Sequence, residues 1–578
     1  MISRTWKIFI IVFFSWQCGK EIETLSKTPG KKTDTNPPPT PSPSTPSKSK
    51  NTVYKNPSRQ IRRLTLDLQN RLPSTEETEI YTRNIDTAES LTTFFLKSND
   101  ADSAMATLHR NFWELWQPKT LDKLSTTDST LRTAMTTTST DLMLDDPIKT
   151  LRFMISQDES FEKIFSKKYS LMEPSTASFY NQTSAQGPDA DTNVVVYSDI
   201  SRPNLGILSS FGWNASLPKN SGSKNYSGAA EAIRKLTCLS FNSAESHNFA
   251  LAGINTVDAN LVSTASSHTK CTSCHNQFHT LAEGLPYLSS STSLTSWLTY
   301  DQSTFSGGIY KGKSYVSPDE LANLMATDSR ISSCELENVT EEILQREMSS
   351  LVDQDLKQNL FERWTDSKNV KNLVADLIAS PEYQHQVFGT TGSTTNNLSS
   401  VRVFGPAQWD GFIKQILPQY TIRNLVLQNP TSGKSAGNPE VISLANLVPR
   451  QRLNGYEKQF IPSELYTQSA FDLAVRIADA VVASELSSTA LAQNRKVLMS
   501  LPDFDAYGAT SPEVKNQISD TWNKWTSLKT TSSDYRISKL YSVYSESIET
   551  GSSDLEKSRN AWKWVLISIL IAPEFIIY

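Results

Sequence analysis

Two cysteines and a histidine in residues 271–275 carry the most specific chemistry in this sequence. The segment reads C-x-x-C-H, with Cys271, Cys274 and His275 at its three fixed positions. Two intervening residues on a helical turn place both sulfurs on one side, where each can form a thioether bond to a vinyl group along one edge of a porphyrin. His275 is then carried under the ring, where its imidazole can bind iron as the proximal ligand. The spacing predicts one haem c, attached covalently through Cys271 and Cys274.

Three other interpretations of this segment are weaker. A zinc knuckle would use Cys271, Cys274 and His279, but its fourth ligand would fall at Gly284, and no second Cys or His pair lies nearby. A thioredoxin-like redox pair needs a βαβ context, which the flanking sequence does not suggest. A plain surface turn is the third alternative. With five Cys and six His in 578 residues, a chance match to all fixed positions is expected on the order of once in two thousand such chains.

The second axial position of the iron has several candidates. His279 lies four residues after His275 on the same expected helix, and therefore on the same side of the ring. His268 lies only three residues before the motif and has a similar problem unless the chain doubles back. His247 lies in a polar stretch and is free to fold over the ring. The position could also be open, which would favour small-molecule binding or peroxide chemistry.

Met325 is the thioether candidate for the same position. It follows the start of a helix that residues 317–320 (SPDE) predict, with serine as the N-cap, proline at the first position and glutamate at the third. A methionine ligand would raise the redox potential. The alternative is that Met325 is a core residue beside Leu321 and Leu324.

The remaining cysteines are Cys18, Cys238 and Cys334. We assign Cys18 to lipidation, which leaves Cys238 and Cys334 as the last pair. In an oxidising compartment an unpaired thiol is unusual, so we expect these two to form a disulfide. It would close a loop around the haem segment and contribute on the order of 4 kcal/mol by the loop-entropy model. Two separate buried thiols are the alternative.

The N-terminal residues predict export. Residues 1–17 combine the positive charges of Arg4 and Lys7 with an apolar stretch, IFIIVFF, which is too short to span a bilayer. Cys18 then lies where a lipoprotein signal places its lipidated cysteine, although the preceding Ser-Trp-Gln departs from the usual box. Secretion with another cleavage site is the alternative. Export suits the haem, because c-type haem is attached outside the cytoplasm. We therefore expect a lipid-anchored protein of the periplasm, the outer membrane or the cell envelope.

Residues 18–57 are rich in Pro, Ser, Thr and Lys and contain almost nothing apolar. Such a segment cannot bury a core, and its prolines favour extended conformations. It is either a tether that holds the folded part away from a membrane or an N-terminal tail without a function. From about residue 58 onward, helical periodicity predominates.

We expect a mainly α-helical fold of multi-helix domains, with long loops around the haem site and little β-structure. Typical helical signals are one apolar face at Ile61, Leu64 and Leu68 and a capping box at residues 74–77 (STEE). His109 lies beside an apolar helical stripe, where a packed or surface histidine is more common than a ligand.

The domain organisation follows from composition. Further apolar periodicity covers residues 148–165, and 194–197 (VVVY) is the only β-like run between residues 181 and 228. Residues 389–400 are rich in Gly, Ser, Thr and Asn and form the best boundary in the chain. The prediction is a haem domain at 58–388, a linker at 389–402 and a C-terminal helical domain at 403–578. The end of the first domain, LIASPEY at 377–383, is echoed by LIAPEF at 570–575.

Patches of residues 58–578 resemble the haem-associated domain families of unknown function that are abundant in planctomycetes and some other bacteria. The patches that carry the resemblance are RLTLDL (63–68) with RLP (71–73), FEKIFSKKYSLM (161–172), GIL (206–208), LTC (236–238), residues 332–344, AFDLAVRIADA (470–480) and APEF (572–575). The C-x-x-C-H motif accompanies such domains. The resemblance implies an exported cytochrome c-like lipoprotein, and it implies no substrate.

Other chemistry is not indicated. The sequence contains no phosphate-binding loop, dinucleotide fingerprint, nucleophile elbow or HExxH zinc motif. With 56 basic and 60 acidic residues and a net charge of −4, no nucleic-acid partner is implied. Three functions are then open: electron transfer with an unidentified redox partner protein, a haem enzyme with an open distal site that is peroxidase-like or oxidises a substrate, and a surface binding or scaffold lipoprotein in which the haem is structural.

Overall fold

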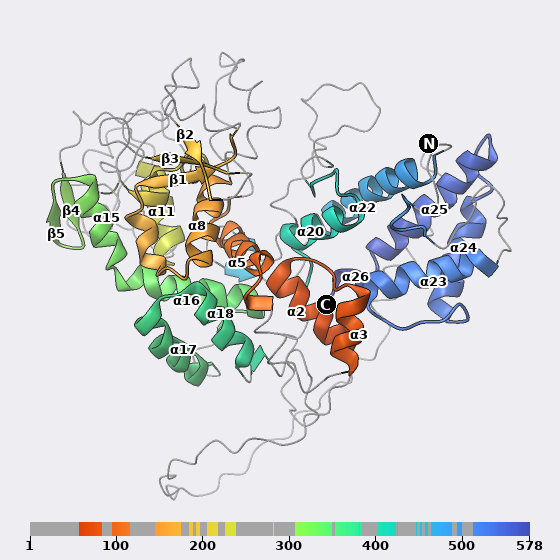
Figure 1. Ribbon diagram of the computed structural model, residues 1–578, viewed down its shortest axis with the longest axis horizontal. Helices are drawn as coiled ribbons and strands as arrows, with labels where there is room; N and C mark the ends of the chain where they lie inside the picture. Colours follow the sequence, from red (N-terminus) through yellow and green to blue (C-terminus); the bar gives the residue numbers. More distant parts are fainter. Residues whose placement is uncertain are drawn as a thin grey trace, which may run out of the picture. The chain divides into compact units, whose positions relative to one another are not determined.

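Helices make up most of the described part of the chain, as the sequence predicts (Figure 1). The structure is a computed structural model of the 578-residue chain. It describes residues 57–83, 95–115, 145–174, 184–188, 192–196, 205–217, 226–238, 281, 307–348, 353–380, 382–383, 402–422, 425, 447, 451–453, 457–459, 464–487, 494–499 and 512–578. The predicted signal segment and Cys18 lie outside these residues, as does the predicted tether up to residue 56. Among the described residues, no helix is both long enough and apolar enough to cross a membrane.

One group of helices surrounds a hydrophobic core whose residues run from Ile61 to Tyr383, which we call the first core. Its helices are α2 (Pro57–Gln69), α3 (Thr75–Arg83), α5 (Asn99–Phe112), α8 (Asp146–Ser156), α10 (Phe211–Ala215), α11 (Tyr226–Thr237), α15 (Pro318–Ala326), α16 (Ser329–Leu344), α17 (Gln354–Ser367) and α18 (Val370–Ala379), with the 3-10 helices η3 (Phe161–Phe165) and η5 (Gly206–Ser209). Helix α5 packs on α8, and α11 packs on α16.

A second group surrounds a core whose residues run from Val403 to Phe575, joined by Leu66 and Leu72, which we call the second core. Its helices are α20 (Pro406–Ile416), α22 (Glu464–Glu485), α23 (Pro512–Thr526), α24 (Tyr535–Ser547), α25 (Asp554–Leu570) and α26 (Pro573–Ile576). Helix α25 packs against both α22 and α24. Most of the apolar residues of α25 are buried in the second core.

The β-structure is limited to short antiparallel pairings. Strand β3 (Asn193–Val196) lies between β1 (Tyr169–Met172) and β2 (Ser184–Gln186), so that Val194 pairs with Leu171 on one side and with Ala185 on the other. Strand β3 is the β-like run that the sequence predicts. Its two partners were not predicted, because three or four residues are too few to show an alternating pattern. The other pairs are β4 (Gly308–Tyr310) with β5 (Lys313–Tyr315) and β6 (Gln451–Leu453) with β7 (Glu457–Gln459).

The helix-start signals in the sequence are confirmed by the caps. The backbone N–H of Glu77 donates to Ser74 Oγ at 3.0 Å, and the Glu77 carboxylate accepts from the Ser74 N–H at 2.7 Å. Ser317 caps α15 by accepting from the Glu320 N–H at 3.2 Å. Each cap satisfies an N–H that the first helical turn leaves unpaired.

The apolar periodicity over residues 148–165 proves to come from two elements. Helix α8 ends at Ser156, and η3 begins only at Phe161. Asp158 between them has φ +52°, a left-handed conformation that cannot continue a right-handed helix. The apolar residues of both elements nevertheless pack in the first core.

The two cores separate along the chain at the predicted linker, but one helix belongs to both. Residues 384–401, which include most of that linker, lie outside the described residues. Helix α2 places Leu64 in the first core and Leu66 in the second, and all described residues belong to one unit, Val53–Tyr578. The division into two domains therefore stays a prediction, and α2 would be shared between them.

Candidate functional site

The C-x-x-C-H motif lies between two fixed points of the described structure. Cys271, Cys274 and His275 are outside the described residues, together with His247, His268 and His279, so the ligation of the haem stays a prediction. Between Cys238 and Gly307 the structure describes only Leu281. This residue is helical, fully buried and part of the first core. Leu281, six residues after His275 in the sequence, therefore has a defined place in the first core.

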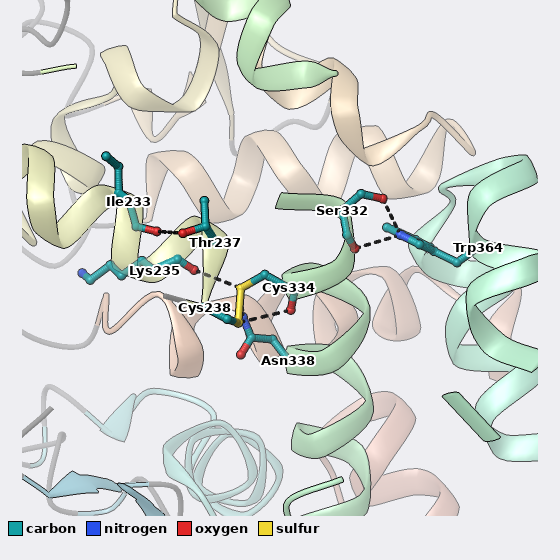
Figure 2. The surroundings of a disulfide bond; sticks show 8 residues. All are labelled: Ile233, Lys235, Thr237, Cys238, Ser332, Cys334, Asn338 and Trp364. Atoms are coloured by element: carbon teal, nitrogen blue, oxygen red, sulfur yellow. Dashed lines mark hydrogen bonds between the residues drawn. A yellow bond between two sulfur atoms is a disulfide. The ribbon is translucent and has the colours of Figure 1, made fainter. Parts of the chain in front are cut away.

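The chain that leads to the motif is held by a disulfide between Cys238 and Cys334, the pair that remained after the other cysteines were assigned (Figure 2). The S–S distance is 2.13 Å, the Cα–Cα distance is 5.3 Å and the sequence separation is 96 residues. Cys238 follows the last residue of α11, and Cys334 lies within α16. The bond fixes the end of α11 to α16, and the segment that it closes contains the whole motif.

Cys238 has a backbone conformation that is unusual for a side chain of its size. Its φ is +55°, in the left-handed region where helices commonly terminate and where glycine is the usual residue. Helix α11 therefore ends in a terminating turn, and the cysteine is tolerated there because its sulfur is bonded to α16. Asn338, one turn after Cys334, donates from Nδ2 to Cys334 Sγ at 3.2 Å (Figure 2).

Helix α16 contributes several buried acidic side chains to the first core. Three of its glutamates, Glu335, Glu341 and Glu342, are at most 3% exposed, although buried carboxylates are rare unless they are paired. Each has a partner: Glu335 contacts a histidine, Glu341 accepts from the Met348 N–H at 3.2 Å, and Glu342 accepts from Asn111 Nδ2 at 2.6 Å. Two of these contacts tie α16 to α5.

His109 of α5 is the partner of Glu335, and both side chains are buried. His109 Nδ1 is 2.8 Å from the Met105 carbonyl, and Nε2 is 2.5 Å from Glu335 Oε1. Because a carbonyl can only accept, Nδ1 carries a hydrogen, and one further hydrogen lies between Nε2 and the carboxyl group. Both ring nitrogens are thus engaged, so His109 is a packed histidine, one of the two roles that the sequence favours, and no nitrogen is left for a metal.

Removal of the histidine should destabilise the protein strongly. His109→Ala leaves the Glu335 carboxyl group buried without its partner, which should lower the free energy of unfolding by about 3–5 kcal/mol. Glu335→Gln should cost clearly less, because the amide can donate a hydrogen bond to Nε2. Urea unfolding, monitored by circular dichroism, measures the change in the free energy of unfolding for each variant. Equal losses in the two variants, or an unchanged His109→Ala protein, would contradict this assignment.

Met325 lies in α15 and is 1% exposed within the first core. Leu321 and Ala322 of the same helix belong to the same core. Burial in apolar surroundings is what a core methionine and an iron-ligating methionine have in common. The role of Met325 as distal ligand therefore stays a prediction.

Most polar contacts inside the cores could not be predicted from the sequence. Residues 53–578 contain no group of three or more His, Cys, Asp or Glu side chains placed to hold a metal ion, as far as they are described. Some of these polar contacts join residues that are far apart in the sequence. His109 and Glu335, for example, are 226 positions apart. The four-residue spacing of Arg63 and Asp67, which form an ion pair at 2.7 Å, is one of the few local signals of such a contact.

Comparison with known proteins adds no relative. No protein-family model, no curated protein and no solved structure matches this chain. The resemblance to the planctomycete haem-associated families accordingly stays a prediction from the sequence patches.

Proposed function

We propose that this protein is an exported monohaem c-type cytochrome that transfers electrons at the cell envelope. Cys271 and Cys274 would hold the haem covalently, and His275 would bind its iron. The haem would supply one-electron redox chemistry at a potential set by its second axial ligand and surroundings. The protein's own part is to hold the motif segment, which it does through the Cys238–Cys334 disulfide on one side and the buried Leu281 on the other.

The observation that carries the proposal is the complete C-x-x-C-H pattern inside a segment that a disulfide closes. Disulfides persist in oxidising compartments outside the cytoplasm, which is also where c-type haem is attached. The disulfide and the motif thus support the same location as the N-terminal signal and the lipidated Cys18. The partners would be the membrane, through this lipid, and a redox partner protein.

The optical spectrum of the haem-loaded protein tests the function. Electron transfer predicts a low-spin, six-coordinate haem that cycles reversibly between its oxidised and reduced forms. A high-spin, five-coordinate ferric spectrum that changes on addition of peroxide would instead assign the protein to catalysis. A haem that neither accepts nor releases electrons would leave a structural role.

Substitution of Met325 tests the distal ligand separately. Met325→Leu nearly conserves the side-chain volume, so the core should lose less than about 1.5 kcal/mol. If Met325 binds the iron, the variant should lose the sulfur-to-iron absorption band and have a lower redox potential. Met154, which is equally buried in the first core, provides the control, because Met154→Leu should leave the spectrum unchanged. If the spectra of both variants are identical to that of wild type, Met325 is a core residue and does not bind the iron.

A further inference from the structure

Helix α2 carries two consecutive buried arginines whose side chains together contact both cores. Arg62 and Arg63 are 2% and 4% exposed. Arg62 donates from Nη2 to the Phe575 carbonyl at 2.6 Å, and its guanidinium lies 5.5 Å from the centre of the Phe404 ring. Both of these residues belong to the second core. Arg63 donates from Nη2 to the Ile343 carbonyl at 3.3 Å, at the end of α16 in the first core, and from Nη1 to the Tyr578 carbonyl at 3.4 Å.

Asp67, one turn after Arg63, is a carboxylate that three side chains share. Arg63 Nε lies 2.7 Å from Asp67 Oδ2, Arg402 Nη1 lies 2.6 Å from Oδ1, and the Tyr383 hydroxyl donates to Oδ2 at 2.9 Å. Asp67, Tyr383 and Arg402 are all at most 3% exposed. We call Arg62, Arg63, Asp67, Tyr383 and Arg402 the α2 network.

The backbone around Arg402 ties the network to the end of the chain. Arg402 N donates to the Tyr578 carbonyl at 3.1 Å, and Tyr578 N donates to the Arg402 carbonyl at 2.8 Å. Phe404 N donates to the Ile576 carbonyl at 3.1 Å, so the two segments pair as a short antiparallel bridge. The Arg402 side chain meanwhile donates to the Ile343 carbonyl at 3.1 Å, the same α16 acceptor that Arg63 uses. Arg402 therefore links the second core to the C-terminal end of α16.

The two echoed sequences both end at this network. Tyr383 closes the first echo and contacts Asp67, whereas Phe575 closes the second and accepts from Arg62. The tyrosine and the phenylalanine are both fully buried, one in each core. Two similar helix ends thus reach α2 from different cores: one is bound by Arg62, and the other by Asp67. The Arg63 guanidinium also lies 5.7 Å from the centre of the Tyr383 ring.

The charges of the network depend on one another. Burial works against the charge of Arg63, but Asp67 outweighs it, so the pKa of Arg63 is raised above its usual value. Burial, with the Asp67 charge added, raises the pKa of Tyr383 well above its usual value, which keeps the hydroxyl protonated as a donor. Removal of Asp67 would leave the guanidinium groups of Arg63 and Arg402 buried without a carboxylate, a strongly unfavourable state.

We propose that the α2 network is a conformational coupling device that makes the two cores unfold as one cooperative unit. Asp67 is its centre, because it joins α2, the first-core residue Tyr383 and the second-core anchor Arg402. Loosening of the second core then pulls Arg402 from Ile343 and exposes the end of α16, the helix that bears Cys334. The two cores share stability through this network in addition to the apolar contacts of Leu66 and Leu72.

The test uses calorimetry of the full mature chain with two buried aspartates exchanged in turn. Wild type should show one transition with equal calorimetric and van't Hoff enthalpies. Asp67→Asn should split it into two transitions separated by about 10 °C. Asp353 is the matched control, because it is fully buried in a bidentate pair with Arg346 at 2.5 and 2.6 Å and is not a member of the α2 network. Asp353→Asn should lower the melting temperature and keep a single transition.

Hydrogen exchange shows which core opens first. In Asp67→Asn, peptides from α22 and α25 should exchange under conditions that still protect α5 and α16, or the reverse, whereas in wild type all four should open together. If Asp67→Asn does not fold, Tyr383→Phe can be used in its place. This variant removes one hydrogen bond to Asp67 and should split the unfolding transition by a smaller temperature difference. The proposal is overturned if wild type already shows two transitions, or if the Asp67 or Tyr383 variant unfolds as a single unit like Asp353→Asn.

Discussion

Replacement of Cys271 and Cys274 by alanine should remove the haem from the denatured protein completely. Both thioether bonds depend on these thiols, so matured wild type should retain haem on a denaturing gel and have the mass of the polypeptide, its lipid and one haem. The double variant should give no haem stain, and its mass should be that of the lipidated polypeptide without haem. The measurements are in-gel haem staining and intact-mass spectrometry after expression with a haem-attachment system.

The control for this prediction lies inside the motif. Ser273→Ala changes a position that the pattern leaves free, so haem should stay attached in full. His275→Ala should affect ligation more than attachment, with an altered spectrum and some haem still bound through the sulfurs. Colourless wild-type protein with the mass of lipidated polypeptide alone would refute the haem assignment. It would leave the α2 network proposal intact, because no residue of that network belongs to the motif.

Removal of the Cys238–Cys334 disulfide should cause a large loss of stability. Cys238→Ser with Cys334→Ser opens a loop whose ends are 96 residues apart, and the loop-entropy model then gives a loss of about 4–5 kcal/mol in the free energy of unfolding. Guanidinium unfolding of wild type and the double variant measures the difference.

A reducing agent gives the matched control for the disulfide. A dithiol should lower the stability of wild type to about that of the double serine variant and should leave the variant itself unchanged. The same treatment should not release a thioether-bound haem. Two freely reactive cysteines in denatured, unreduced wild type, beyond those of the motif, would show that Cys238 and Cys334 do not pair.

The amino-acid sequence by itself determined the local features. The mainly helical class follows from apolar periodicity, and the starts of α3 and α15 follow from caps whose side chains reach only three residues along the chain. The candidate haem site is also local, since its two cysteines and its histidine lie within five residues. Cysteine counting suggested the Cys238–Cys334 pair because few partners were left. Such features can be recognised without knowledge of the fold, because the interacting groups are close in sequence.

Only the tertiary structure decided which polar groups are buried together. Arg62 and Arg63 look like the solvent-facing side of α2 in the sequence, since they lie off the stripe of Ile61, Leu64 and Leu68. They are buried because α2 contributes to two cores, and their partners at Phe575 and Ile343 lie hundreds of residues away. The contact between His109 and Glu335 was hidden for the same reason. A buried charge is stable only beside its partner, and chain topology, which no short sequence pattern encodes, brings the two together.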